Sequence, residues 1–111
     1  MKVIYNSILP FPGYIAINLF GMVFVRRKYE GKEPKNMLRH EAIHTAQMRE
    51  LGFILFYVLY FFEWFFRLCW YMNFDRAYRN LSFEVEAYAH EADLEYLENR
   101  KPFAQWRKQA E

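Results

Sequence analysis

The sequence predicts an α+β fold in which a small antiparallel N-terminal sheet or hairpin is followed by three main helices. Three observations point to this class. Residues 2–27 are rich in β-branched and aromatic residues, residues 36–51 and 82–99 carry apolar side chains at helical spacing, and residues 52–73 are almost continuously apolar. Because the 111 residues contain no repeat and no Gly/Ser-rich linker, we expect a single domain over residues 1–111.

Two strand-like runs open the chain, at residues 2–9 and 14–27, and the turn-forming residues 10–13 separate them. Gly21 interrupts the second run and indicates a bulge or a tight turn that divides it into two strands. The charged stretch that follows predicts a loop. Residues 1–35 are therefore expected to form the sheet and the loop that leaves it.

A first helix is predicted over residues 36–51. Asn36 stands at its start and is a residue type that commonly caps helix N-termini. Apolar residues then recur among polar ones at helical spacing, and Gly52 marks the end.

Residues 51–72 are the most apolar part of the chain, and eleven of these twenty-two residues are aromatic. This density is typical of a lipid headgroup boundary or of an apolar interface. We expect a helix, within residues 52–73, that lies on or dips into a membrane. A full span is disfavoured by the charges of Glu63 and Arg67, although their i, i+4 spacing lets them pair. A core helix or a contact between two copies of the chain is the alternative.

Residues 73–81 are expected to form a polar connection, after which Ser82 caps the last long helix. That helix is predicted over residues 82–99, and Pro102 prevents it from continuing further.

His40, Glu41 and His44 form an HExxH motif within the predicted helix 36–51. Residues four apart lie on one face of a helix, so the two imidazoles can bind one Zn²⁺ ion. The carboxylate of Glu41 is offset from both, and it can accept a proton when water attacks a carbonyl group. Gln47 lies one turn further along the same face, where it either hydrogen-bonds a ligand imidazole or a substrate, or is solvated.

A catalytic zinc site takes three protein ligands and leaves a fourth position for water, so one more ligand must come from elsewhere in the chain. The predicted helix 82–99 is the obvious source, because it is rich in side chains that bind metals. The candidates on it are Glu84, Glu86, His90, Glu91 and Asp93.

The two blocks together resemble gluzincin-type zinc metallopeptidases, in which a Glu on a later helix completes the HExxH site. The later motif of that family reads Glu, two free positions, a small residue, then Asp or Asn. Here it starts at Glu84, has Ala87 as the small residue, and departs from the pattern at Tyr88. The resemblance implies a minimal zincin-like fold with Glu84 as the third zinc ligand.

Among such enzymes, the membrane zinc peptidases are the most similar, because they often carry a Glu-x-Glu-Ala run at this point. The chain is also similar to small uncharacterised proteins that share an aromatic helix and a Phe-Glu-x-Glu-Ala-Tyr block. Glu84 and Glu86 fit both patterns.

Helix geometry leaves the choice between the two glutamates open. At about 100° per residue, Glu84 falls near Glu91, on a side whose further acids indicate a solvated face. Glu86 borders the apolar stripe that contains Ala87, and is the alternative third ligand. His90 is the remaining candidate for the third ligand. If it is not a ligand, it is expected, like Gln47, to support the ligands through hydrogen bonds.

The expected function is zinc-dependent hydrolysis of a peptide bond. Glu41 would take the proton of the attacking water and return it to the leaving amine. The developing oxyanion needs a hydrogen-bond donor from Tyr88, His90 or Arg39, with Tyr88 as the first candidate. The substrate would be a peptide or protein. The strand expected at residues 22–27 either offers it a free edge for pairing or is buried within its own sheet.

The alternative function is that of a membrane-associated or interaction protein with a structural, non-catalytic zinc site. A fourth protein ligand would then close the site, supplied by His90, Glu86 or Asp93. Residues 51–72 would provide the working surface, toward a membrane or toward a second copy in a homo-oligomer.

Charge and cysteine content exclude other classes. Fifteen basic and thirteen acidic residues give a net charge of +2, too weak a field to favour nucleic acid as a partner. The single Cys69 cannot form an internal disulfide, which fits a reducing compartment. Pro10, Pro12 and Gly13 break the apolar N-terminus, so we expect no signal peptide. The expected location is the cytoplasm or the cytoplasmic face of a membrane.

Overall fold

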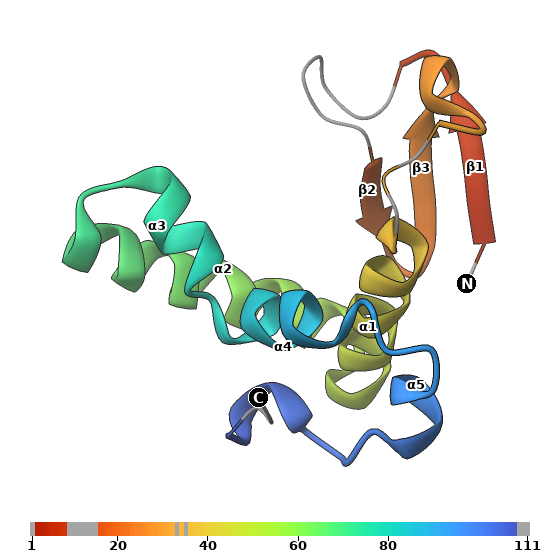
Figure 1. Cartoon of the computed structure of the whole chain (residues 1–111). Coiled ribbons are helices and arrows are strands. Elements are labelled where there is room, and N and C mark those ends of the chain that lie inside the picture. Colours follow the sequence, from red (N-terminus) through yellow and green to blue (C-terminus); the bar gives the residue numbers. More distant parts are fainter. Residues whose placement is uncertain (1, 9–15, 33, 35, 109–111) are drawn as a thin grey trace.

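The computed structural model describes residues 2–8, 16–32, 34 and 36–108, and it confirms the α+β class. A three-stranded sheet stands at one end of the molecule and the helix pair α2 and α3 at the other, with α1 between them (Figure 1). The predicted turn at residues 10–13 lies outside the described residues. The strands are β1 (Lys2–Asn6), β2 (Ala16–Leu19) and β3 (Met22–Arg26). The helical elements are η1 (Arg27–Tyr29), α1 (Met37–Leu51), α2 (Phe53–Tyr71), α3 (Phe74–Arg79), α4 (Ser82–His90), α5 (Tyr96–Asn99) and η2 (Ala104–Trp106).

The sheet is mixed rather than antiparallel, with the strand order β1-β3-β2. β2 and β3 form the expected antiparallel hairpin, and the turn between them places Phe20 and Gly21 at positive φ. β1, however, pairs in parallel with β3. Val23 and Val25 of β3 are completely buried. The central position in the sheet, with a strand on each side, favours this burial of β3.

This order overturns the alternative in which residues 22–27 offer a free edge to a substrate. β3 is hydrogen-bonded to a strand on each side. Among the described strands, it is β2 that lies at the edge next to the helices, and β2 contacts α1.

α1 has the predicted bounds, between Asn36 and Gly52, but its start is built differently. Asn36 adopts a left-handed conformation and its side chain makes no cap to the helix backbone. Its Oδ1 instead accepts a hydrogen bond of 3.2 Å from Nη1 of Arg39. Gly52, at φ +72°, ends the helix in a conformation that favours glycine.

The chain between α2 and α4 is helical where the sequence predicted a connection. Asn73 caps α3, because its side chain accepts a 3.0 Å hydrogen bond from the backbone N–H of Arg76. Ser82 does not cap α4 as predicted. Its N–H and Oγ–H donate to the carboxylate of Glu63, at 2.7 and 2.6 Å, so a side chain from α2 satisfies the start of α4.

The last helix is shorter than predicted: α4 ends at His90, and Tyr96–Asn99 forms the separate α5. A continuous helix would carry Arg100 about 21 Å beyond Glu86. The turn at residues 91–95 instead brings Arg100 back to Glu86, with Nε 2.5 Å from Oε2. The buried ion pair therefore explains the break that the sequence pattern did not indicate.

The core joins α1, α2 and α4. Met48, Phe56 and Phe83 form its centre, each at most 3% exposed. Leu51 at the end of α1 and partly buried residues in the first half of α2 pack against them. This packing fixes α4 against α1, and so sets the position of the chemical groups that the two helices carry.

Candidate metal centre

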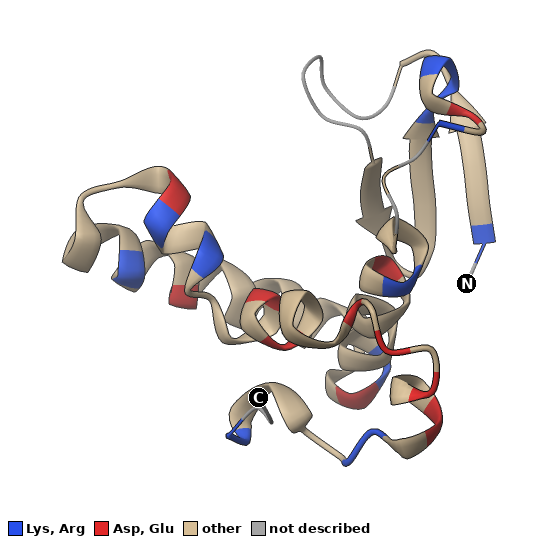
Figure 2. Ribbon diagram, viewed as in Figure 1, with Lys and Arg blue, Asp and Glu red and all other residues tan. Residues whose placement is uncertain are grey.

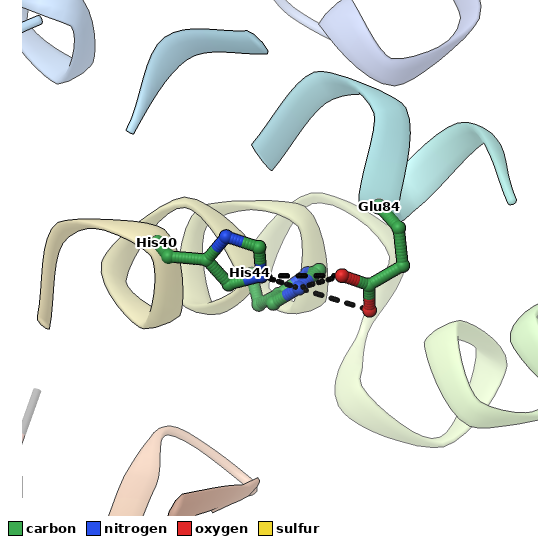
Figure 3. Close-up of side chains that lie close together, drawn as sticks. All are labelled: His40, His44 and Glu84. Atoms are coloured by element: carbon green, nitrogen blue, oxygen red, sulfur yellow. Dashed lines mark hydrogen bonds and ion pairs between the residues drawn. The ribbon is translucent and has the colours of Figure 1, made fainter. Parts of the chain in front are cut away.

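Two histidines of α1 and one glutamate of α4 meet in the interior. Nε2 of His40 and Nε2 of His44 lie 3.2 Å apart, as their spacing of four residues allows. Oε1 of Glu84 lies 3.1 Å from the first of these nitrogens and 3.2 Å from the second. All three residues are buried, and Figure 3 shows their side chains pointing at one another.

The three atoms form a triangle that fits a metal ion. A tetrahedral Zn²⁺ ion bonded at about 2.0–2.2 Å places neighbouring ligand atoms about 3.4 Å apart. The observed separations of 3.1 to 3.2 Å are close to one face of such a tetrahedron. Two imidazoles and a carboxylate are also a common donor set for transition metals. The buried group of His40, His44 and Glu84 can therefore hold a metal ion.

Gln47 fixes the orientation of the His44 ring. Its amide Nε2 donates to the carbonyl of Phe83 at 3.0 Å and to Oε1 of Glu86 at 2.9 Å. The amide oxygen must then face His44, where it accepts a 2.8 Å hydrogen bond from Nδ1. A neutral His44 therefore carries its proton on Nδ1 and directs the lone pair of Nε2 toward Glu84 and His40.

An acid lies beside the corresponding nitrogen of His40. Nδ1 of His40 is 3.7 Å from Oε1 of Glu91, and the Glu91 carboxylate is partly exposed. The edge of the Tyr88 ring packs against the His40 imidazole, with centroids 4.5 Å apart. His44 thus has a hydrogen-bond acceptor at Nδ1, and His40 has an acid near that nitrogen, while Nε2 of each ring faces the site.

Two tyrosines bind the carboxylate of Glu84. Tyr60 donates to Oε2 at 2.8 Å and Tyr78 donates to Oε1 at 3.2 Å. Burial raises the pKa of Glu84, but His44, His40 and Tyr60 outweigh it and hold that pKa well below its usual range. For His44, burial lowers the pKa, but the Glu84 carboxylate has the larger effect in total and raises this pKa to about 9. A metal ion would compete with this proton for Nε2.

Glu86, the alternative ligand, lies in a different network. Besides the amide of Gln47, it binds Tyr96, whose hydroxyl donates to Oε2 at 2.7 Å, and the guanidinium of Arg100. Burial raises the pKa of Glu86, but the hydrogen bonds from these groups hold it below its usual range. Of the two glutamates, the structure brings Glu84 to the histidines and places Glu86 behind Gln47.

Glu41 lies at a large cavity that reaches the metal-binding group. The cavity has a volume of about 860 Å³, and its walls come from β2, α1, α2, α3 and Glu84 of α4. Glu41, His40 and His44 are among its lining residues. Burial raises the pKa of the Glu41 carboxyl. The group that can hold a metal therefore faces a space large enough for a substrate.

The remaining predicted residues occupy different places. Tyr88 is 41% exposed, and its hydroxyl lies 3.2 Å from that of Tyr78, which in turn binds Glu84. His90 lies outside the group of three and stacks on the ring of Tyr96, with centroids 4.0 Å apart. Arg39 donates from Nη1 to the backbone carbonyl of Glu91 at 2.6 Å.

The sequence patterns did not indicate the two tyrosines that bind Glu84. Tyr60 lies in an almost continuous apolar run. Its spacing of three residues from Tyr57 was the one sign that the hydroxyls share a side of the helix. In the structure, both hydroxyls are on the side of α2 that faces the protein. Tyr78 had no comparable signal, because the helix that carries it was expected to be a connection.

No family model, curated protein or solved structure was found to match this chain.

Proposed function

We propose that the chain is a zinc-dependent metallopeptidase whose ion is held by His40, His44 and Glu84. The observation that carries the proposal is the triangle of donor atoms, with sides of 3.1 to 3.2 Å, at the wall of a cavity of about 860 Å³. Within the described residues, the ligand group contains no fourth member. Three protein ligands and an open side are the pattern of a catalytic zinc site.

A zinc ion bound there would supply a Lewis acid that polarises a carbonyl group and activates water. Glu41 lines the same cavity and follows His40 directly, so its carboxylate accepts the proton of the attacking water and returns it to the leaving amine. Tyr88, whose hydroxyl lies 3.2 Å from that of Tyr78, is the proposed hydrogen-bond donor to the oxygen that gains charge, because the single proton of Tyr78 is directed at Glu84.

An extended peptide is the substrate that the cavity suits best. All four residues of β2, Ala16–Leu19, line it. Among the described strands, none pairs with the second edge of β2. That edge can add a peptide strand, whose backbone then runs past Glu41 and the metal-binding group.

The proposal is tested by separating metal binding from turnover. We expect the Glu41→Gln variant to keep its zinc and its far-UV circular dichroism, because Glu41 is not a ligand. Its hydrolysis of unfolded casein should fall at least about a hundredfold. Glu98→Gln, which removes an exposed acid far from the motif in sequence, is the matched control and should be fully active.

Two results decide against the peptidase. Activity that survives Glu41→Gln would remove its proposed proton carrier. A zinc-loaded wild-type chain that hydrolyses neither casein nor a mixed peptide library would instead favour a structural zinc site in an interaction protein.

A further inference from the structure

The side of α2 that faces away from the rest of the protein is entirely apolar. We call this surface the outer face. Its residues are Ile54, Leu55, Val58, Phe61, Phe62, Phe65, Phe66, Cys69 and Trp70. Each is exposed, and the fractions for the eight besides the cysteine run from 43% at Val58 to 83% at Trp70. Soluble monomers rarely expose so large a continuous apolar surface.

The two charges of α2 lie outside the outer face. Nε of Arg67 donates to Glu63 at 2.9 Å, and the same carboxylate accepts both hydrogen bonds from Ser82 of α4. At about 100° per residue, both charged residues fall outside the arc of the outer face. The two charges, which in the sequence disfavoured a full span, therefore do not interrupt the outer face.

The length of α2 also fits a bilayer. It is the described helix that is long and apolar enough to cross a membrane, and of its residues only Phe56 is buried. The stretch from Ile54 to Trp70 extends about 25 Å. Trp70, at the far end and 83% exposed, is a residue type that prefers the lipid headgroup boundary.

α3 determines how the helix can lie. α3 packs back against α2, and it carries Asp75, Arg76 and Arg79. Figure 2 shows these charges beside an α2 ribbon that is otherwise mostly uncharged. Spanning the bilayer would bring α3 into the hydrocarbon together with α2, which its three charges oppose. An orientation in the membrane plane keeps α3 at the surface.

The charges around the outer face suit an anionic membrane. Arg67 pairs with Glu63, and Arg79 pairs with Asp75. Arg76 has no acidic partner among the described contacts. α2 and α3 together therefore carry one net positive charge. Anionic lipid headgroups complement it.

The outer face also continues into the cavities. Phe61 lines a second cavity of about 320 Å³, together with Tyr60, Trp64 and Tyr78, which also line the larger one. Phe74 stacks on Trp64, with centroids 6.1 Å apart, and is 70% exposed. Contact of the outer face with lipid would therefore place this part of the cavity wall next to the membrane surface.

We propose that the outer face of α2 binds a lipid bilayer in the plane of its surface, with α3 and α4 on the water side. The occupant is lipid rather than a second copy, because the face is continuously apolar along the helix, carries no ionic group and has a basic flank. This proposal does not depend on the metal or on peptidase activity.

Sedimentation of the full chain with lipid vesicles tests the proposal. We expect the chain to pellet with phosphatidylcholine vesicles, and more strongly when phosphatidylglycerol is added. Phe62→Glu and Phe66→Glu should each lower the partition coefficient at least about tenfold, since each removes a ring that the bilayer would bury and adds a charge. Leu94→Glu, at an exposed apolar residue outside α2 (80% exposed), is the matched control and should bind like the wild type.

The single cysteine reports the orientation. Cys69 is exposed on the outer face, so a membrane-impermeant maleimide should modify it in solution and not on vesicles. Spin labels at Cys69, and at Val58→Cys in a Cys69→Ser chain, measure depth at two points eleven residues apart. Binding in the plane predicts similar depths, whereas a spanning helix would separate them by up to about 16 Å.

Three results would overturn the proposal. The first is a chain that stays in the supernatant with both vesicle types. The second is a stable dimer without lipid that Phe62→Glu dissociates and that does not bind vesicles, which would assign the outer face to a second copy. The third is a large depth difference between the two labels, which would replace the in-plane orientation with a span. Unchanged circular dichroism of the variants excludes unfolding as the cause of lost binding.

Discussion

At the scale of single residues, Gln47 links the metal-binding group to the second buried network. Its amide oxygen accepts from His44, and its amide nitrogen donates to Glu86 and to the backbone of α4. Every polar atom of this side chain is used, and the residue is completely buried. Its orientation is therefore determined by α4 and in turn determines which nitrogen of His44 faces His40 and Glu84.

Replacing Gln47 by leucine should weaken metal binding. The variant leaves Nδ1 of His44 without its acceptor, and losses of this kind lower metal affinity by about 10- to 100-fold. Competition titration with a zinc chelator measures the change, and ¹⁵N NMR of the imidazole reports the tautomer. Thr45→Val is the matched control: Thr45 is buried on the same helix but bonds to Asn18. Equal losses of zinc affinity in both variants would contradict the assigned role.

The residues that carry chemistry were predictable to the extent that they are close in sequence. His40, Glu41 and His44 follow from one motif on one helix. The motif did not decide between Glu84 and Glu86 as the third member, because that choice depends on how α4 is rotated against α1. Burial of both glutamates, 3% and 0% exposed, also shows why an expected solvated face for Glu84 was misleading.

At the scale of elements, the segment after α4 acts as a clamp on the helices that form the site. Arg100 is buried, with 6% of its side chain exposed, and it pairs with Glu86 of α4. Its Nη1 lies 3.1 Å from Oε1 of Glu50 in α1. This contact is an ion pair whose geometry does not meet that of a hydrogen bond. One guanidinium thus links the C-terminal end of α1 to the middle of α4.

Arg100→Leu should destabilise the fold strongly, because it leaves the buried Glu86 carboxylate without its cation. Breaking a buried pair in this way costs about 3–5 kcal/mol of the free energy of unfolding. Arg79→Leu is the control: its pair with Asp75 is 61% and 74% exposed, and such pairs contribute about 1 kcal/mol or less. Urea denaturation measures both. A loss from Arg100→Leu no larger than that of the control would contradict the clamp.

Local sequence patterns predicted some of the elements and not others. Helices 36–51 and 52–73 were predicted almost to the residue, because Gly52 separates them and apolar spacing continues through both. The parallel pairing of β1 and the break after His90 were not. Both are imposed by distant contacts, the burial of β3 and the return of Arg100 to Glu86, which leave no local signal.

At the scale of the whole molecule, a metal ion would be a cross-link between α1 and α4. The first supplies His40 and His44 and the second supplies Glu84, with core residues of α2 packed against both helices. A ligand that binds only the folded chain stabilises it by mass action. Metal binding and global stability should therefore be coupled.

Zinc is expected to raise the free energy of unfolding by about 2.7 kcal/mol when its free concentration is a hundredfold above its Kd. Calorimetry in zinc-buffered solution, with and without EDTA, measures the shift in Tm. Glu84→Gln should show little response, whereas Glu98→Gln should respond like the wild type. A wild-type Tm that is the same with zinc and with EDTA would contradict the coupling.

The central claim is that His40, His44 and Glu84 form a zinc site, and zinc stoichiometry tests it most directly. The chain has three histidines, of which His90 lies outside the group, so it provides its own control. Elemental analysis after equilibrium dialysis should give about one zinc per chain for the wild type and for His90→Ala. It should give almost none for His44→Ala, with all three proteins folded by circular dichroism. A wild-type chain without zinc, or a His44→Ala variant that keeps it, would contradict the account.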